Sequence, residues 1–116
     1  MRFAVFALVV LSVSRAFARG PHTSVEGPWW VVAGSFANAD NSNFQATAVS
    51  KASAAVRRCG LEPFNDFSMK FYGFRPGYDV VVVGGYNSRD DANAALAILR
   101  PCVPSAFIKA GRHLGE

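Results

Sequence analysis

The sequence has no hydrophobic run long enough to cross a membrane. Its longest unbroken apolar stretch near the start covers residues 3–11, whereas a transmembrane helix needs about 20 apolar residues. The stretch follows Arg2 and precedes Ala16-Phe17-Ala18. A basic start, a short apolar segment and a small-x-small site are the parts of a secretory signal peptide. We therefore expect cleavage after Ala18, a periplasmic or secreted mature chain, and no stable membrane span after cleavage.

The sequence also has only a small excess of positive charge. The formal net charge of +4 falls to +2 once Arg2 and Arg15 leave with the signal peptide. A nucleic-acid-binding domain normally carries a clustered basic face, so we expect no nucleic-acid partner. The sequence also lacks an Asn-x-Ser/Thr acceptor, which is compatible with a bacterial periplasmic protein.

Catalytic and metal-binding patterns are missing as well. The sequence shows no nucleophile–base pair at a recognisable spacing, and Gly84-Gly85 lacks the other glycines of a dinucleotide fingerprint and the lysine of a P-loop. His22 and His113 lie near the two ends, without partners that would hold a metal. We predict no enzyme, no cofactor and no metal, and both histidines are expected to have no role.

The sequence does contain an internal repeat, in which one structural unit occurs twice. Each copy is an apolar strand, a glycine, a small residue, an aromatic residue, a polar loop and an alanine-rich helical pattern. The two strands read Trp29-Trp30-Val31-Val32-Ala33-Gly34-Ser35-Phe36 and Asp79-Val80-Val81-Val82-Val83-Gly84-Gly85-Tyr86. Such an internal repeat predicts the architecture before any single residue is interpreted.

The first helix is expected to begin near Asn41 or Ser42, and the second to be capped by Ser88. A strand is predicted in the later part of residues 62–72, and a last strand at 103–109. The order β-α-β-β-α-β predicts an α+β split βαβ (ferredoxin-like) fold. Its four-stranded antiparallel sheet would carry two helices on one face and leave the other face open.

The predicted organisation has four parts. They are a signal peptide at 1–18, a flexible linker at 19–28, the repeated domain at 29–110 and a loose tail at 111–116.

The repeated strands resemble the SPOR domain, a sporulation-related repeat of bacterial envelope proteins. The family pattern, an aromatic-x-Val-x-Val-Gly-small-Phe strand followed by an alanine-rich helix, is similar to residues 30–36 and 80–86. Residues 87–99 resemble the family's second helix, and residues 105–109 its closing strand. The resemblance covers residues 29–110, nearly all of the mature chain.

The resemblance implies a non-catalytic module that binds peptidoglycan glycan strands, especially strands stripped of stem peptides, which occur at division septa. Envelope or cell-division proteins would be further partners. The implied binding surface is the open sheet face, with Ser35 and Val32 on the first strand and Tyr78 and Val80 on the third. Trp30 and Tyr78 would be stacking platforms for sugars and Ser35 a polar contact.

The alternation of side chains along a strand places Trp30, Val32, Tyr78, Val80 and Val82 on this face. A contiguous apolar patch usually marks an interaction site. An alternative is therefore a protein–protein interaction module of the same fold, because docking tolerates valines where many family members carry polar anchors. In a third interpretation the linker or the tail folds over the face and buries it.

For Cys59 and Cys102, the predicted compartment and the predicted topology give opposite expectations about a disulfide. An exported pair favours a disulfide. However, each cysteine lies near the C-terminal end of a predicted helix, and the two helices of the expected fold run antiparallel. A helix of about 15 residues is roughly 20 Å long, whereas a disulfide needs Cα atoms within about 7 Å. We predict no bridge and two buried thiols.

Export gives the first testable prediction. Mass spectrometry of protein recovered from the periplasm or medium is expected to find Arg19 as the first residue. Recovery of chains that begin at Met1 in that fraction would contradict the predicted cleavage.

Overall fold

The predicted order of elements is observed in the computed structural model, which describes residues 26–41 and 45–115. The signal peptide and residues 19–25 of the linker lie outside the described residues. The elements in chain order are β1 (Trp29–Ala37), α2 (Ala46–Arg58), β2 (Phe64–Phe67), the 3₁₀ turn η1 (Ser68–Lys70), β3 (Phe71–Tyr72), β4 (Tyr78–Tyr86), α3 (Arg89–Leu99), β5 (Phe107–Ala110) and β6 (Arg112–His113).

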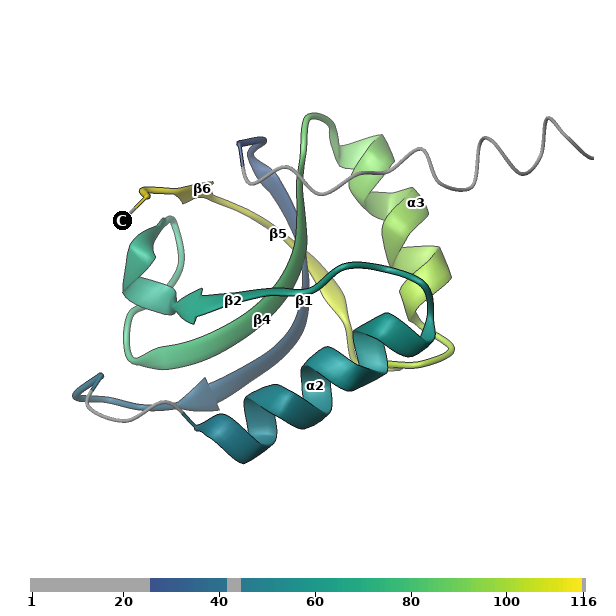
Figure 1. Ribbon diagram of the computed structural model, residues 1–116. Coiled ribbons are helices and arrows are strands. Elements are labelled where there is room, and N and C mark those ends of the chain that lie inside the picture. The colour runs from purple at the N-terminus through teal and green to yellow at the C-terminus, as the bar shows by residue number, and fades with distance from the viewer. Residues whose placement is uncertain (1–25, 42–44, 116) are drawn as a thin grey trace, which may run out of the picture.

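The main sheet has the strand order β2-β4-β1-β5, and every neighbouring pair is antiparallel. The opening strands of the two repeats, β1 and β4, therefore lie side by side in the centre. Helices α2 and α3 lie on one side of the sheet, and the short pair β3–β6 lies on the other (Figure 1). This arrangement confirms the predicted α+β split βαβ fold.

The two faces of β1 and β4 contribute to two separate apolar clusters. Val31, Val81 and Val83 pack with buried residues of the helices, such as Val56 and Leu99. The other face forms a second cluster, and its strand residues are Trp30, Val32, Val80 and Val82, with Tyr78 packed at its edge. The alternation predicted from the sequence is confirmed for both strands.

A β-bulge in β1 decides on which face Ser35 lies. Val32 pairs with Val82 and Gly34 pairs with Val81, so Ala33 is an extra residue in β1. The shift brings Ser35 opposite Val80 and onto the face of Val32, although strict alternation from residue 32 would put it on the helix side.

At this bulge Gly34 leaves room for the ring of Phe36 and for α2. A Cβ at Gly34 would lie 2.8 Å from the ring of Phe36 and 3.3 Å from the Cβ of Ala52. A larger residue would first displace the Phe36 ring and would also crowd Ala52 of α2.

The second repeat has its own bulge. Trp29 pairs with Tyr86 and Trp30 pairs with Gly84, so Gly85 is the extra residue, and the Gly84–Gly85 peptide bond is cis. A Cβ at Gly85 would collide with the backbone of Gly27. Gly27 is buried against this bulge. The prediction of a flexible linker up to residue 28 is therefore wrong at its last residues, because Gly27 packs against the second repeat.

Asp79 joins three elements at one corner of the sheet. Its carboxylate is fully buried at the start of β4. It accepts hydrogen bonds from Nδ2 of Asn38, at 3.0 Å, and from the backbone N–H of Gln45, at 2.6 Å. A negative charge at the N-terminus of α2 is favourable for the helix dipole. The contact helps to place the helix start at Ala46, later than the predicted start.

The second helix begins as predicted. The hydroxyl oxygen of Ser88 accepts a hydrogen bond from the backbone N–H of Asp91 at 3.0 Å, which confirms Ser88 as the N-cap of α3.

The segment between the repeats differs from its prediction. The sheet strand β2 covers Phe64–Phe67, and η1 interrupts the expected later strand. The reason is tertiary: the buried hydroxyl of Ser68 accepts the backbone N–H of Tyr78, and Phe71 then turns into the second cluster. The alternation of residues 67–72 predicts a strand of the main sheet. Residues 68–72 instead leave that sheet and lead into β3, which belongs to the two-stranded sheet.

The prediction of two free thiols is wrong, because Cys59 and Cys102 form a disulfide. Their Cα atoms are 6.1 Å apart. The helices do not run antiparallel side by side: their C-terminal ends converge at one corner of the domain (Figure 1). Cys102 also lies beyond the end of α3, where the chain turns back toward Leu99.

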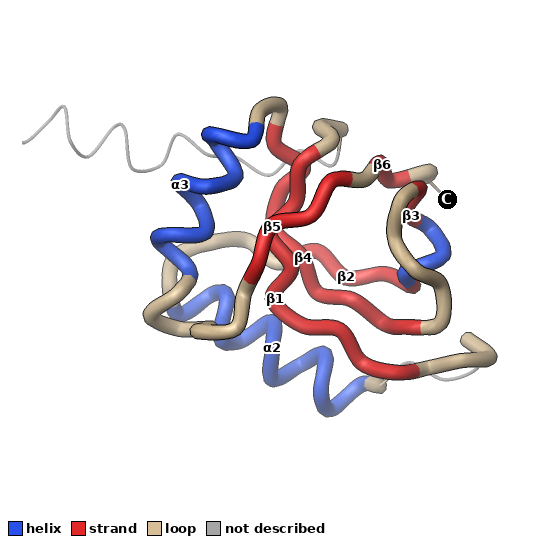
Figure 2. Tube along the Cα trace, turned by 180° about the vertical axis from the view of Figure 1, so that it is seen from behind, coloured by secondary structure: helices blue, strands red, loops and turns tan. Residues whose placement is uncertain are grey.

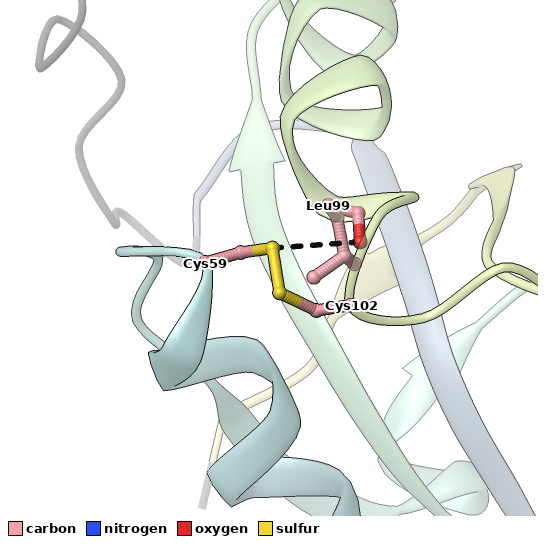
Figure 3. Close-up of a disulfide and its surroundings, with 3 residues drawn as sticks. All are labelled: Cys59, Leu99 and Cys102. Carbon is pink, nitrogen blue, oxygen red and sulfur yellow. Dashed lines mark hydrogen bonds between the residues drawn. A yellow bond between two sulfur atoms is a disulfide. The ribbon is translucent and has the colours of Figure 1, made fainter.

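Figure 3 shows the bridge between the loop after α2 and the loop after α3. The Sγ atom of Cys59 lies 3.8 Å from the carbonyl oxygen of Leu99. A disulfide sulfur carries no proton, so we regard this approach as a packing contact. The bridge connects the helix of one repeat to the helix of the other.

The bridge should make a large contribution to stability. A cross-link joins cysteines 43 positions apart. In the loop-entropy description it lowers the entropy of the unfolded chain and so raises its free energy by about 4 kcal/mol. Urea unfolding of the mature protein is expected to shift to lower urea on reduction, and the C59S/C102S variant should show the lower midpoint with or without reductant. Equal midpoints for the oxidised and reduced protein would contradict this expectation.

Candidate functional site

The sheet face opposite the helices is only partly open, because a cluster of aromatic side chains covers one part of it. Phe71 packs edge-on against Trp30 at 5.1 Å between ring centroids and stacks on Phe74 at 4.5 Å. The side chain of Trp30 is 0% exposed as a result. Figure 2 shows β3 and β6 on this side of the sheet, away from the helices. We call Phe64, Phe71, Phe74 and His113 the aromatic cover, and Trp30 lies beneath it.

The C-terminal segment holds the cover in place. Strand β6 pairs with β3. Nε1 of Trp30 donates to the carbonyl oxygen of Gly111 at 3.0 Å, and the N–H of Leu114 donates to the carbonyl of Lys70 at 2.8 Å. The prediction of a loose tail is therefore wrong for residues 111–114. The tail is short and polar, and its order comes from contacts with distant residues.

His113 is a structural residue rather than one without a role. Its ring lies edge-on to Phe64 and Phe71, with centroids 5.0 Å from each. Nδ1 accepts the N–H of Gly115 at 3.2 Å, so Nε2 carries the ring proton and donates to Oδ2 of Asp66 at 2.9 Å.

A pocket of about 170 Å³ opens beside the aromatic cover. It lies over the part of the β1–β4 pair that the cover leaves free, and it also receives side chains from η1, from the turn before β4 and from β5. The lining residues are Val32, Ser35, Ser68, Phe74, Arg75, Tyr78, Val80, Phe107 and Lys109.

The structure brings four of the five predicted site residues to this pocket. Val32 and Val80, each 3% exposed, lie under its surface, and Ser35 and Tyr78 are accessible at its edge. Trp30 lies outside the pocket and beneath the aromatic cover, where a ligand does not reach its ring.

The pocket also contains residues that were not predicted as site residues, notably Arg75, Phe107 and Lys109. Phe107 pairs with Val32, and Lys109 pairs with Trp30 across the β1–β5 ladder, so both point to the same face. The alternation of Phe107 and Lys109 with Ile108 in the sequence could have indicated that both side chains lie on this face. Arg75 follows β3 in a turn, and no sequence pattern would place its side chain.

The chemistry of the pocket suits binding. None of its lining residues is an Asp, Glu, His or Cys, so the hydroxyls of Ser35 and Ser68 have no carboxylate or imidazole base within the lining. Among residues 26–41 and 45–115, no group of three or more potential metal-ligating side chains occurs. An aromatic and aliphatic lining with a few polar groups is typical of a ligand site.

The phenol of Tyr86 lies outside the pocket, in the helix-side cluster. Burial of the phenol, and secondarily the negative charge of Asp91, raises the pKa of Tyr86 to about 12. Tyr86 therefore stays protonated at neutral pH and acts as a core residue.

The comparison that identifies the domain is with family profiles. The profile of the SPOR domain matches residues 25–110, which include both repeats, both helices and β5. The chain belongs to the SPOR domain family. SPOR domains bind peptidoglycan and are binding modules rather than enzymes. No curated protein and no solved structure gives a significant match to the chain.

No helix of this SPOR domain within the described residues is both long and apolar enough to span a bilayer.

The tail contacts generate a stability prediction. The His113 side chain is 5% exposed, and His113→Ala would remove its ring contacts and leave Asp66 without this partner. We expect a loss of about 1–3 kcal/mol in the free energy of unfolding, measured by urea denaturation. The matched control is Leu114→Ala, because the Leu114 side chain is 60% exposed and should cost little. Equal stabilities of the two variants would contradict an ordered tail.

Proposed function

We propose that this SPOR domain is an exported, non-catalytic module that binds peptidoglycan glycan strands stripped of their stem peptides, the form found at division septa. The observation that carries the proposal is the convergence of Ser35, Val32, Tyr78 and Val80 on a single pocket. These are the positions to which the family pattern assigns binding.

The proposed sugar contacts differ in part from the set first expected. Tyr78 keeps its role as a stacking platform, and Phe107, 48% exposed at the pocket, replaces the buried Trp30 as the second. Aromatic rings offer a large contact area with little conformational entropy to lose. The hydroxyl of Ser35 is available for a hydrogen bond to a sugar substituent.

The size of the pocket favours one unit of a polymer. Pockets that enclose a whole small molecule measure roughly 300–1,000 Å³, whereas this one has about 170 Å³. A glycan strand would place one sugar in it and continue across the surface.

The proposed location is the periplasm. SPOR domains are typical of cell-envelope proteins, and the Cys59–Cys102 disulfide is favoured in an oxidising compartment. Both are compatible with the proposed signal peptide and with a role beside the division machinery.

The alternative, docking of a protein on an apolar sheet face, is less well supported. Trp30, Val32, Val80 and Val82 are each at most 3% exposed. A partner would have to displace the aromatic cover to reach Trp30, and Val32 and Val80 offer little exposed surface at the pocket.

Binding to purified sacculi tests the proposal. The wild-type domain should sediment with amidase-treated sacculi more than with untreated ones. Phe107→Ala or Tyr78→Ala should each weaken binding about thirtyfold, because loss of one aromatic anchor costs about 2 kcal/mol. Ile98→Ala on α3, an exposed apolar residue away from the pocket, is the matched control, and Lys51→Ala on α2 is a second.

Thermal unfolding of every variant should accompany the measurement, since Tyr78 also packs against the second cluster. A wild-type domain that ignores treated sacculi would overturn the proposed function. Equal binding to treated and untreated sacculi would favour the protein-docking alternative or a broader glycan preference.

A further inference from the structure

The pocket has positive charge and no negative charge of its own. Arg75 reaches it from the turn between β3 and β4, and Lys109 reaches it from β5. The other lining residues are uncharged. Two cations from separate elements thus border one small, largely apolar space.

Neither cation is neutralised by an acidic side chain of residues 26–41 or 45–115. Within the part of the chain that the structure describes, the close contact between an acidic and a basic side chain is His113–Asp66, and no acidic side chain lies within 4.0 Å of Arg75 or Lys109. Surface cations usually project into water, where their ion pairs contribute little to the stability of the fold. Here both line the pocket in which the ligand is expected.

Lys109 is held toward the pocket by an aromatic ring. Its Nζ atom lies 5.5 Å from the centroid of the Phe74 ring. Phe74 is in turn stacked on Phe71, so the aromatic cover supports one wall of the site. Such a cation–π contact positions the ammonium group without using all three of its hydrogen-bond donors.

The walls should strengthen the interaction with an anion. Val32, Phe74 and Val80 are 8% exposed or less, and a bound sugar would displace water from above them. Charges attract more strongly as the local dielectric falls, and the guanidinium of Arg75 can bind a carboxylate through two parallel hydrogen bonds.

We infer that the pocket is a carboxylate site, in which Arg75 and Lys109 hold the free lactyl carboxylate of a muramic acid residue. This inference rests on the proposed function. When a stem peptide is attached, the same carbonyl is part of a neutral amide. Removal of the peptide therefore creates one negative charge, and the two cations would bind that charge directly.

The test compares two strand preparations that differ only in that charge. Glycan strands released from amidase-treated sacculi are used as they are, or after carbodiimide coupling to methylamine, which converts each carboxylate to a neutral amide. The wild-type domain should bind the carboxylate strands about tenfold more tightly, or about 1.4 kcal/mol. That advantage should shrink as salt is raised, because salt screens exposed charges.

The variants assign the preference to the two residues. In the R75Q/K109Q variant the ratio of the two affinities should fall toward one, and each single variant should give an intermediate ratio. The K51Q/R57Q variant, which removes two exposed cations from α2 on the helix side, should keep the wild-type ratio. The comparison of the two preparations with the wild-type domain needs no variant and so does not depend on variant folding.

The outcomes separate the inference from the function beneath it. If neither preparation binds, the proposed function fails and the carboxylate site fails with it. If both bind equally well, the glycan function stands and the carboxylate inference is overturned. Released stem peptides also carry carboxylates, so they are added as competitors. Competition by peptides as strong as that by the strands would overturn assignment to muramic acid.

Discussion

Strands β1 and β4 are apolar on both faces, and this constraint shapes the rest of the domain. One face is covered by α2 and α3, which bury Val31, Val81 and Val83. The opposite face carries Trp30 and further valines, so a sheet left open there would expose a large apolar surface to water. Residues 68–74 and the C-terminal segment supply the second cover. The pocket is the part of that face which the second cover leaves free.

Features that depend on local patterns could be predicted from the sequence, and features that depend on how elements meet could not. The valine-rich repeat predicted the strand order and both faces, and Ser88 predicted the start of α3. The disulfide was missed because it depends on the angle between two helices. That angle is set by side-chain packing on a twisted sheet, and no spacing in the sequence reports it. The tail was missed because it is ordered by Trp30, Phe71 and Asp66, all distant in the chain.

The candidate site divides in a similar way. Ser35 and Tyr78 came from resemblance, and Ser35 reaches the pocket only because of an inserted residue in β1 that strict alternation ignores. Phe107 and Lys109 could have been found from the alternation of β5. Arg75 lies in a turn, where the direction of a side chain depends on its neighbours in space. The charge of the pocket was therefore the property least predictable from the sequence, although the carboxylate inference depends on it.

The contact between Gly27 and Gly85 has a consequence for valence. A duplicated sheet could present two equivalent sites, one at each bulge, with Gly85 as the counterpart of Ser35. The backbone of Gly27 occupies the space beside Gly85, where a Cβ would have no room. The segment before β1 thus fills the space beside Gly85, whereas the equivalent position Ser35 lines the pocket. Under the proposed function, a domain with one such pocket would attach tightly to a long polymer through avidity, with several chains held near the same strand.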